Sequence, residues 1–241
     1  MPDPLLTLEG VHTHIGRYHI LQGVDFDVPR GSFTVLLGRN GAGKTTTLRT
    51  IMGLWKASQG KIRFAGEDVT VRPTPDIAAA GIAYIPENMS VFSGLTVREN
   101  LIHAARAGKI DSARLEWIFS LFPAMQRFFG AAAGTLSGGQ KQMLAIARAL
   151  IEPRDLILVD EPTKGLAPAI VANMIKAFRE VKNAGATVLL VEQNFMAAKM
   201  LGDAVAVMDD GRIVHRGAMA ELAADHALQH RLLGLHMDAH Q

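Results

Sequence analysis

Short apolar runs alternate with amphipathic segments through much of the chain. Apolar runs at 33–37, 156–159 and 187–191 predict buried strands, whereas apolar residues repeat at helical spacing over 45–52 and 169–182. Strands that alternate with helices in this way are typical of a parallel sheet covered by helices. The pattern therefore predicts an α/β fold with a mostly parallel core sheet.

Further strands are predicted outside this core. Segments 5–9 and 23–28 have the pattern of short strands, and 60–65 is a third candidate for the same antiparallel flank. Strand-like residues at 205–208 and 212–215 flank Asp209-Asp210-Gly211, which predicts a β-hairpin turn. We expect the antiparallel flank to pack beside the core sheet.

The stretch between Glu87 and Leu136 has helical patterning. Thr96 and Glu99 have the spacing of a capping box, in which side chains and backbone N–H groups bond reciprocally at the start of a helix. Farther along, an apolar stripe repeats at helical spacing and consists of Trp117, Ile118, Leu121, Phe122, Met125, Phe128 and Phe129. We expect most of this stripe to be core.

An octapeptide after the first core strand has the sequence of a phosphate-binding loop. It consists of Gly38, Arg39, Asn40, Gly41, Ala42, Gly43, Lys44 and Thr45. Its glycines let the backbone turn tightly and point N–H groups at phosphates, while the helix that follows presents its positive end. Lys44 is placed to reach the β and γ phosphates, and the Thr45 hydroxyl is placed to bind Mg²⁺. With Thr46, these residues predict a site for ATP.

The strand at 156–159 ends in two carboxylates, Asp160 and Glu161. Acidic turns also follow many core strands, but Asp160 suits a Mg²⁺ ligand that acts directly or through water. Glu161 is the candidate to orient or deprotonate an attacking water. Because Pro162 disfavours a helical backbone at the residue before it, we expect Glu161 to be extended, with its carboxylate aimed outward.

A third motif, Leu136-Ser137-Gly138-Gly139-Gln140, precedes an apolar-periodic helix at 141–150. Ser137 and Gln140 form a second capping box, and the two glycines open the helix start to an anion. The chain thus has two phosphate-binding helix starts, but only the first has a lysine and a metal-ligating hydroxyl. The whole string, placed before Asp160 and Glu161, resembles the signature of ATP-binding cassette (ABC) proteins.

The resemblance covers nearly the whole chain and implies a P-loop NTPase cassette. It implies a single domain over 1–241, with a catalytic lobe from 1–87 and 150–241 and an inserted helical signature lobe from 88–149. In that family two cassettes meet head to tail, so the signature of one chain contacts the ATP held by the other. The resemblance therefore implies a dimer with shared ATP sites.

Other partners are implied in the same way. The second cassette would be a related ATPase or another copy of this chain, working with two transmembrane permeases and a periplasmic substrate-binding protein. Part of the apolar stripe and the loop at Glu87 would form a groove for a cytoplasmic helix of a permease. The chain would then be cytoplasmic and peripheral on the inner face of the plasma membrane.

Within the family, the stretches 85–87, 91–101 and 191–194 look most like the LivF-type ATPases of branched-chain amino-acid importers. Three positions depart from the commonest ABC pattern as that branch does: Glu87 for glutamine, Gln193 for histidine and Ala167 for aspartate. Glu87 can still ligate Mg²⁺. Gln193, a second candidate catalytic residue, can donate to a γ-phosphate but cannot change charge near neutral pH.

The residue that contacts adenine is less strongly indicated. Ile15 lies where many cassettes have an aromatic residue, so aliphatic packing is expected to replace stacking on the base, with Tyr18 as a weaker candidate. In the tail, His226 and His230, and then His236 and His240, have i, i+4 spacing. No carboxylate or cysteine completes a metal set at similar spacing, so no metal other than Mg²⁺ is expected.

Composition agrees with a globular protein that has a sizeable core. The 241 residues are 49% hydrophobic and 20% charged, and none is cysteine, which excludes disulfides and fits a reducing compartment. No apolar run approaches the roughly 20 residues needed to span a bilayer. A net charge of +2 from scattered basic residues argues against nucleic acid as a partner.

Three alternatives stay open at this point. Urea or short amides could be the cargo instead of amino acids. A soluble ABC ATPase of DNA repair, chromosome structure or translation belongs to another class, although a single cassette without a coiled-coil insertion or a basic stripe argues against it. The departures at Glu87, Gln193 and Ala167 also fit a cassette that binds ATP only to support an active partner.

Overall fold

The computed structural model describes residues 4–106 and 108–234. In chain order its strands are β1 (Pro4–Ile15), β2 (Tyr18–Pro29), β3 (Phe33–Gly38), β4 (Ala57–Phe64), β5 (Glu67–Asp68), β6 (Ile82–Ile85), β7 (Leu156–Asp160), β8 (Thr187–Val191), β9 (Ala204–Asp209) and β10 (Arg212–Ala218). Its helices are α1 (Lys44–Ile51), α2 (Thr74–Ala79), α3 (Val97–Ala104), α4 (Ser112–Leu121), α5 (Gly138–Leu150), α6 (Pro168–Asn183), α7 (Phe195–Leu201), α8 (Met219–Ala224) and α9 (His226–Leu233). Two 3-10 helices, η1 (Pro123–Phe128) and η2 (Ala133–Thr135), lie before α5.

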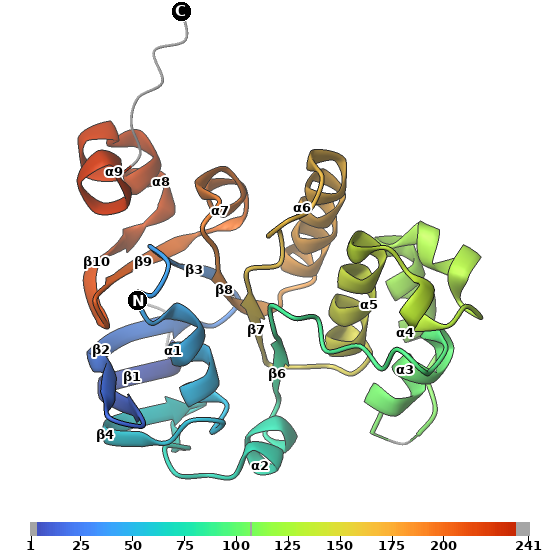
Figure 1. The fold of residues 1–241 in the computed structure, drawn as a ribbon, viewed down its shortest axis with the longest axis horizontal. Coiled ribbons are helices and arrows are strands. Elements are labelled where there is room, and N and C mark those ends of the chain that lie inside the picture. Colours follow the sequence, from blue (N-terminus) through green and yellow to red (C-terminus); the bar gives the residue numbers. More distant parts are fainter. Residues whose placement is uncertain (1–3, 107, 235–241) are drawn as a thin grey trace, which may run out of the picture.

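The larger sheet has the strand order β10-β9-β3-β8-β7-β6. All neighbouring pairs are parallel except β9 and β10, which confirms the predicted α/β class with a mostly parallel sheet. Its central strands are buried on both faces. Val35 and Leu37 pack in the layer that contains α5, α6 and α7, whereas Leu36 packs toward α1 and the antiparallel sheet (Figure 1).

The smaller sheet, β2-β1-β4-β5, is antiparallel and packs beside the core as expected. The predicted strands at 5–9 and 23–28 were too short, because β1 and β2 each have 12 residues. The pairing of β1 with β2 shifts register between Leu8 and Val11, and Gly10 there has a φ of 54°. This bulge interrupts the alternation of apolar residues, so the sequence pattern ended where the strand continued.

The predicted hairpin at the end of the core sheet is present. Asp210 and Gly211 join β9 to β10 with φ values of 42° and 73°, the left-handed geometry that suits a two-residue hairpin turn. The Gly211 carbonyl accepts from the Gln22 N–H at 2.9 Å, and the Gly211 N–H donates to the Ala42 carbonyl at 2.9 Å. The hairpin therefore ties the antiparallel sheet to the phosphate loop.

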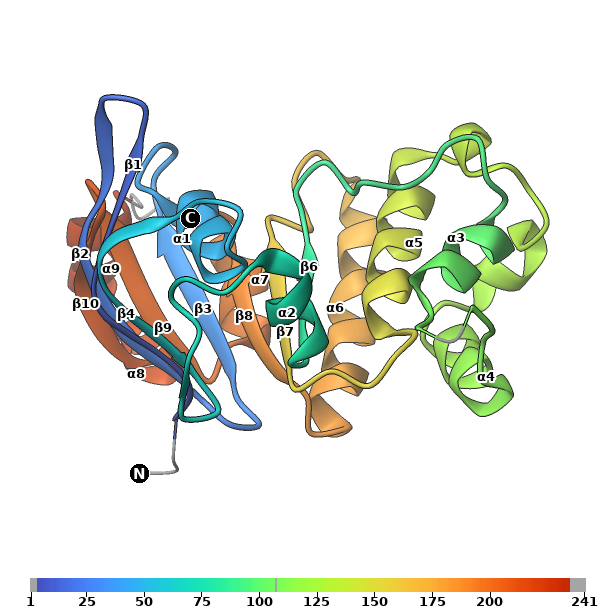
Figure 2. The same cartoon turned by 90° about the horizontal axis from the view of Figure 1, so that it is seen from below.

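Helices α3, α4 and α5 lie together beyond β6, on the side of the molecule away from the antiparallel sheet (Figures 1 and 2). Both predicted capping boxes, at Thr96 and at Ser137, are present. The apolar stripe belongs to the core as expected, but it does not form one helix, because α4 ends before Pro123 and η1 begins there. Proline lacks the N–H that would continue the helix. Within the described residues, no helix is long and apolar enough to cross a membrane.

Candidate nucleotide-binding site

The phosphate loop connects β3 to α1 at the carboxyl edge of the core sheet. Gly38, Gly41 and Gly43 have φ values of 153°, 82° and 108°, which residues with side chains rarely adopt. A Cβ atom on Gly38 would lie 2.3 Å from the Met208 carbonyl oxygen, so the close approach of β9 also requires glycine. The buried Lys44 ammonium donates to the carbonyls of Gly38 and Arg39 at 2.8 and 3.0 Å. The loop thus curves around this ammonium.

A cavity of about 350 Å³ opens beside the loop. It is lined by Ile20, Asn40, Gly41, Gly43, Lys44, Thr45, Thr46, Glu87, Glu161 and Lys164. The structure therefore brings most of the predicted loop residues to one cavity with Glu87 and Glu161. Ile15, the predicted adenine contact, ends β1 opposite Tyr18, and its role stays a prediction. Ile20 is the isoleucine that lines the cavity.

Asp160 ends β7 as a fully buried carboxylate with two hydroxyl partners. The Thr45 hydroxyl donates to Oδ1 at 3.0 Å, and the Tyr84 hydroxyl on β6 donates to Oδ2 at 3.1 Å. Burial raises the pKa of Asp160, and the two hydrogen bonds oppose that rise. Burial and the charge of Asp160 raise the pKa of Tyr84 to about 12, so this hydroxyl keeps its proton near neutral pH. Sequence reasoning missed Tyr84.

Glu161 departs from the expected geometry. Its φ is 45°, so the residue is left-handed rather than extended, and its carboxylate is only 7% exposed rather than aimed outward. Its N–H still donates to the Val191 carbonyl at 2.9 Å, which continues the pairing of β7 with β8. The backbone then turns at the Cα atom, and the left-handed conformation avoids the right-handed helical region that Pro162 disfavours.

The inward turn of Glu161 brings its carboxylate to three nitrogen atoms. The Gln193 amide donates to Oε1 at 2.5 Å, and the Lys44 ammonium lies 3.6 Å from the same oxygen. The Lys164 ammonium lies 3.3 Å from Oε2. The structure thus places the two predicted catalytic side chains, Glu161 and Gln193, in direct contact. Burial lowers the pKa of Lys44, whereas the charge of Glu161 opposes that shift.

Glu87 lies across the cavity in the loop after β6. Its Oε1 atom accepts from the Lys164 ammonium at 2.7 Å, so a single lysine contacts both Glu87 and Glu161. These contacts raise the pKa of Lys164, with the hydrogen bond to Glu87 as the largest cause. Lys164 was not singled out as a site residue from the sequence. Its motif-like neighbours, Glu161-Pro162-Thr163, were the only local signal.

A second buried glutamate, Glu192, joins the loops after β7 and β8. Its carboxylate accepts from the Thr163 hydroxyl at 2.8 Å and from the Thr163 N–H at 3.3 Å. It also accepts from the N–H groups of Gln193 and Asn194, both at 3.2 Å. Burial raises the pKa of Glu192, and these hydrogen bonds oppose the rise. Because the partners of Glu192 flank Glu161 and carry Gln193, this carboxylate fixes the position of both candidate catalytic residues.

The signature residues lie at the start of α5, apart from the phosphate loop. In both views of the fold, α5 and α1 are separated by β6 and β7 (Figures 1 and 2). The side chains of Ser137 and Gln140 each accept from the backbone N–H of the other residue, which is the capping box at the start of α5. Leu136 is buried, and Gly139 packs so closely on α6 that a Cβ there would lie 2.9 Å from Ile170. Around Gly138, a Cβ would meet nothing within 4 Å.

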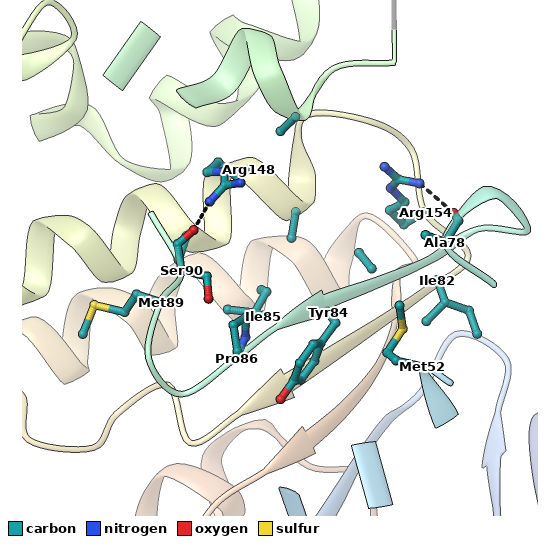
Figure 3. Close-up of a pocket in the computed structure, with 14 residues that line it drawn as sticks. Met52, Ala78, Ile82, Tyr84, Ile85, Pro86, Met89, Ser90, Arg148 and Arg154 are labelled. Carbon is teal, nitrogen blue, oxygen red and sulfur yellow. Dashed lines mark hydrogen bonds between the residues drawn. The ribbon is translucent and has the colours of Figure 1, made fainter. Parts of the chain in front are cut away.

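A second concavity, a groove of about 280 Å³, lies between β6 and α5 (Figure 3). Apolar side chains such as Ile82, Pro86 and Met89 line it, and the residues of the apolar stripe are not among its lining. Arg148 donates to the Ser90 carbonyl in the loop after Glu87, as Figure 3 shows. Residues of one loop, 86–90, therefore line both the groove and the nucleotide cavity.

Two of the four tail histidines belong to the part of the chain that the structure describes. His226 and His230 lie on α9, while His236 and His240 lie outside the described residues. Within 4–106 and 108–234, no group of three or more histidine, cysteine or acidic residues is arranged to hold a metal ion. The oxygen atoms of Thr45 and Asp160 lie 3.0 Å apart at the phosphate loop.

A phosphate loop, a buried strand-end aspartate and a paired glutamate at one sheet edge define an ATP-hydrolysing P-loop enzyme. Residues 21–164 match the ABC transporter family. The high-affinity branched-chain amino acid transport ATP-binding protein BraG of Pseudomonas aeruginosa is 38% identical over 95% of this chain and 100% of its own. The probable branched-chain amino acid transport ATP-binding protein LivF of Archaeoglobus fulgidus is 36% identical over 90% and 93%.

A solved structure of an ATP binding subunit of an ABC transporter agrees with these sequence matches. It superposes with a TM-score of 0.80 at 30% identity, covering 93% of this chain and 94% of the other. The chain belongs to the ABC transporter family and is one of its ATP-hydrolysing cassettes. The resemblance stated from the motifs and the predicted cassette fold are both confirmed.

Removal of the Glu192 carboxylate tests the link between the two loops. In Glu192→Ala, four donors lose their acceptor, and we expect the free energy of unfolding to fall by roughly 3 kcal/mol, because unpaired buried polar groups are costly. The matched control is Glu180→Ala at an exposed position of α6, for which a change below about 0.5 kcal/mol is expected. Urea unfolding measures the free energy of unfolding of both variants. Equal changes would contradict the role of Glu192 in joining the two loops.

Proposed function

We propose that the chain is the ATPase subunit of an importer for branched-chain amino acids. The observation that carries the proposal is the meeting of Lys44, Asp160 and Glu161 at one sheet edge, in a chain similar to two ATPases named for branched-chain amino-acid transport. The 38% identity with BraG over its full length supports amino acids over urea or short amides as cargo. The chain would act on the inner face of the plasma membrane, held there by permeases.

The contacts at the phosphate loop support distinct roles for its residues. Lys44 and the N–H groups of residues 39–46 would bind the phosphates, with Gly38 allowing the turn. Thr45 and Asp160 present oxygen atoms 3.0 Å apart at the loop, and Glu87 lines the same cavity. Oxygen donors of this kind fit Mg²⁺, which when bound would neutralise phosphate charge. These three residues are its proposed ligands.

Glu161 is the proposed base for the attacking water. Its carboxylate faces the phosphate loop, 3.6 Å from Lys44, and the Gln193 amide at 2.5 Å orients it. Carboxylates in such positions can accept a proton from water during phosphate transfer. Because Gln193 stays neutral, its contribution does not depend on pH near neutrality. Its amide would also be available to the γ-phosphate.

The separation of the two phosphate-binding helix starts supports a head-to-tail dimer. The signature, residues 136–140, lies on the helical lobe far from the phosphate loop of the same chain (Figure 2). A second cassette, either a paralogue or another copy, would bring its own signature to the nucleotide. We propose the lobe division of 1–87 with 150–241 and of 88–149, because this arrangement lets the signature move as a unit.

The groove between β6 and α5 is the proposed contact for a permease. Its lining combines apolar side chains with Arg148 and Arg154, and among the described lining residues there is no carboxylate. Burial lowers the pKa of the Arg148 guanidinium, and Phe92 lies 4.8 Å from it. An apolar permease helix with an acidic side chain would fill the groove and offset this charge. The periplasmic binding protein would contribute indirectly by delivering cargo.

Glu161→Gln separates ATP binding from hydrolysis. The amide keeps the shape of the side chain but cannot accept the proton from water, so we expect ATP affinity within about threefold of wild type and turnover reduced by about 10²- to 10⁴-fold. Equilibrium binding of a fluorescent ATP analogue and phosphate release measure the two quantities. Uptake of labelled leucine by cells should fall with turnover.

The control for this variant is Glu221→Gln on the exposed face of α8, where both quantities should stay unchanged. Turnover in Glu161→Gln above about half of the wild-type rate would contradict the role of the base. The proposed cargo would be contradicted if the wild-type protein hydrolysed ATP and wild-type cells took up labelled urea but no labelled leucine.

Gly138→Asp tests the shared site. Gly138 is the first residue of α5, where the helix dipole stabilises a negative charge. A Cβ atom there would meet nothing within 4 Å, so the free energy of unfolding should be unchanged. We expect turnover to fall at least about tenfold, because this carboxylate would face the phosphates held by the second cassette. Thermal unfolding and phosphate release measure the two effects. Gly130→Asp, also in open space, is the control, and equal rates in the two variants would count against a shared site.

Arg148→Gln tests the permease groove. We expect recovery of permeases by affinity capture from solubilised membranes to fall several-fold, because an acidic side chain would lose its partner. Binding of the fluorescent ATP analogue should not change, since Arg148 lines the groove and is not among the residues that line the nucleotide cavity. The matched control is Arg127→Gln at an exposed position of η1. Equal recovery with both variants would disprove an acidic anchor at this groove.

A further inference from the structure

Lys164 connects two acidic side chains that come from different strands. It lies in the turn after β7, where its ammonium is 2.7 Å from Glu87 Oε1 and 3.3 Å from Glu161 Oε2. Glu87 follows β6, and β6 pairs in parallel with β7. The lysine therefore bridges the carboxyl ends of two neighbouring strands directly over the nucleotide cavity, which it also lines.

This bridge holds together groups that would otherwise repel each other. Glu87 and Glu161 both act on Asp160, and the charge of each contributes to the raised pKa of that aspartate. Three carboxylates at one sheet edge thus share two nearby ammonium groups, those of Lys44 and Lys164. Like charges this close favour separation of the loops that carry them, and a cation between them removes that tendency.

The two lysines differ in how easily their ammonium groups can be displaced from the carboxylates. Lys44 is 4% exposed and is held by two loop carbonyls, whereas Lys164 is 53% exposed and Glu87 is 44% exposed. An exposed ion pair contributes little stability and exchanges readily with other cations. Lys164 is therefore the cation at this edge that a stronger competitor can displace.

We propose that Lys164 is a positioning residue that holds Glu87 and Glu161 across the nucleotide cavity and competes with the divalent metal for the Glu87 carboxylate. The inference rests on the proposed function, because the metal is the one that accompanies ATP. The ammonium at 2.7 Å from Oε1 neutralises the charge that would attract a metal ion to Glu87, and it repels a cation that approaches this carboxylate. Lys164 thus sets how strongly Mg²⁺ must bind before Glu87 is released to it.

Two opposite effects follow when this charge is removed. Glu87 becomes free and the cavity gains one net negative charge, so the metal should bind more tightly. Glu161 loses the contact at Oε2, so its carboxylate is less well held for catalysis. A lysine with a merely structural role would weaken both metal binding and turnover when it is replaced.

The test compares the affinity of a fluorescent ATP analogue in saturating Mg²⁺ with its affinity in EDTA. The Mg²⁺ gain is the ratio of the affinity in Mg²⁺ to the affinity in EDTA. It should be about three- to tenfold larger in Lys164→Met than in wild type, because one competing charge has been removed. Phosphate release should show a lower kcat with a lower KM for Mg·ATP. Lys164→Arg keeps the cation and should restore the wild-type gain.

Glu87→Gln supplies the decisive background for the comparison. If Lys164 acts through Glu87, Lys164→Met should increase the Mg²⁺ gain less in the Glu87→Gln background than in the wild-type background. Lys61→Met, at an exposed position of β4, controls for the loss of one positive charge elsewhere. An unchanged or smaller gain in Lys164→Met, or an increase that is just as large without Glu87, would overturn the proposal.

Lys44→Ala distinguishes failure of this inference from failure of the proposed function. If Lys44→Ala still bound the analogue normally, the nucleotide site itself would be wrong. If Lys44→Ala lost binding while Lys164→Met behaved as wild type, only the role of Lys164 would be wrong.

Discussion

The parallel pairing of β3, β8 and β7 is the constraint on which the rest of the site depends. Each strand ends at the same edge of the sheet, so the loops that follow them are neighbours although they lie far apart in the sequence. The loop after β3 brings Lys44, the loop after β7 brings Glu161 and the loop after β8 brings Gln193. The N–H of Glu161 donates to the Val191 carbonyl across this pairing, and that single bond aligns the loops after β7 and β8. A shift of one residue between β7 and β8 would separate Glu161 from Gln193.

A sheet edge this crowded with buried charge is stable only because each charge has its own partners. Asp160 takes two hydroxyl groups, Glu161 takes an amide and two ammonium groups, and Glu192 takes four donors from the adjoining loops. Loss of one partner would leave a charge uncompensated in a place that water barely reaches. The same requirement holds the candidate catalytic groups in place, since the contacts that satisfy each charge also orient it.

The sequence was sufficient to predict the features that depend on contiguous residues. A few neighbouring residues determine each of these features, which are the apolar strands, the phosphate loop, both capping boxes and the hairpin turn at Asp210-Gly211. Their local physics does not depend on distant parts of the chain, which is why these predictions agree with the structure. The bulge at Gly10 is the exception among the strands, because its pairing with two partners outweighs the broken alternation.

Features that depend on register could not be predicted. Glu161 was expected to be extended and to point outward, because Pro162 was considered without the hydrogen bond to Val191 that fixes the backbone before the turn. Tyr84 and Glu192 were missed because their roles exist only once β6, β7 and β8 are paired. Lys164 was missed for the same reason, since Glu87 lies 77 residues away along the chain.

The structure of the single chain gives a packing reason for only one of the two glycines in the signature. Gly139 has an internal reason to be glycine, since any larger residue would clash with Ile170 on α6. Gly138 has no such reason, because the space beside it is open and its φ is not left-handed, while glycine at a helix start carries an entropic cost. A small residue kept at an open surface beside a capped helix N-terminus leaves room for another molecule to approach the backbone closely. This open helix start supports the proposal that the signature contacts the nucleotide held by a second cassette.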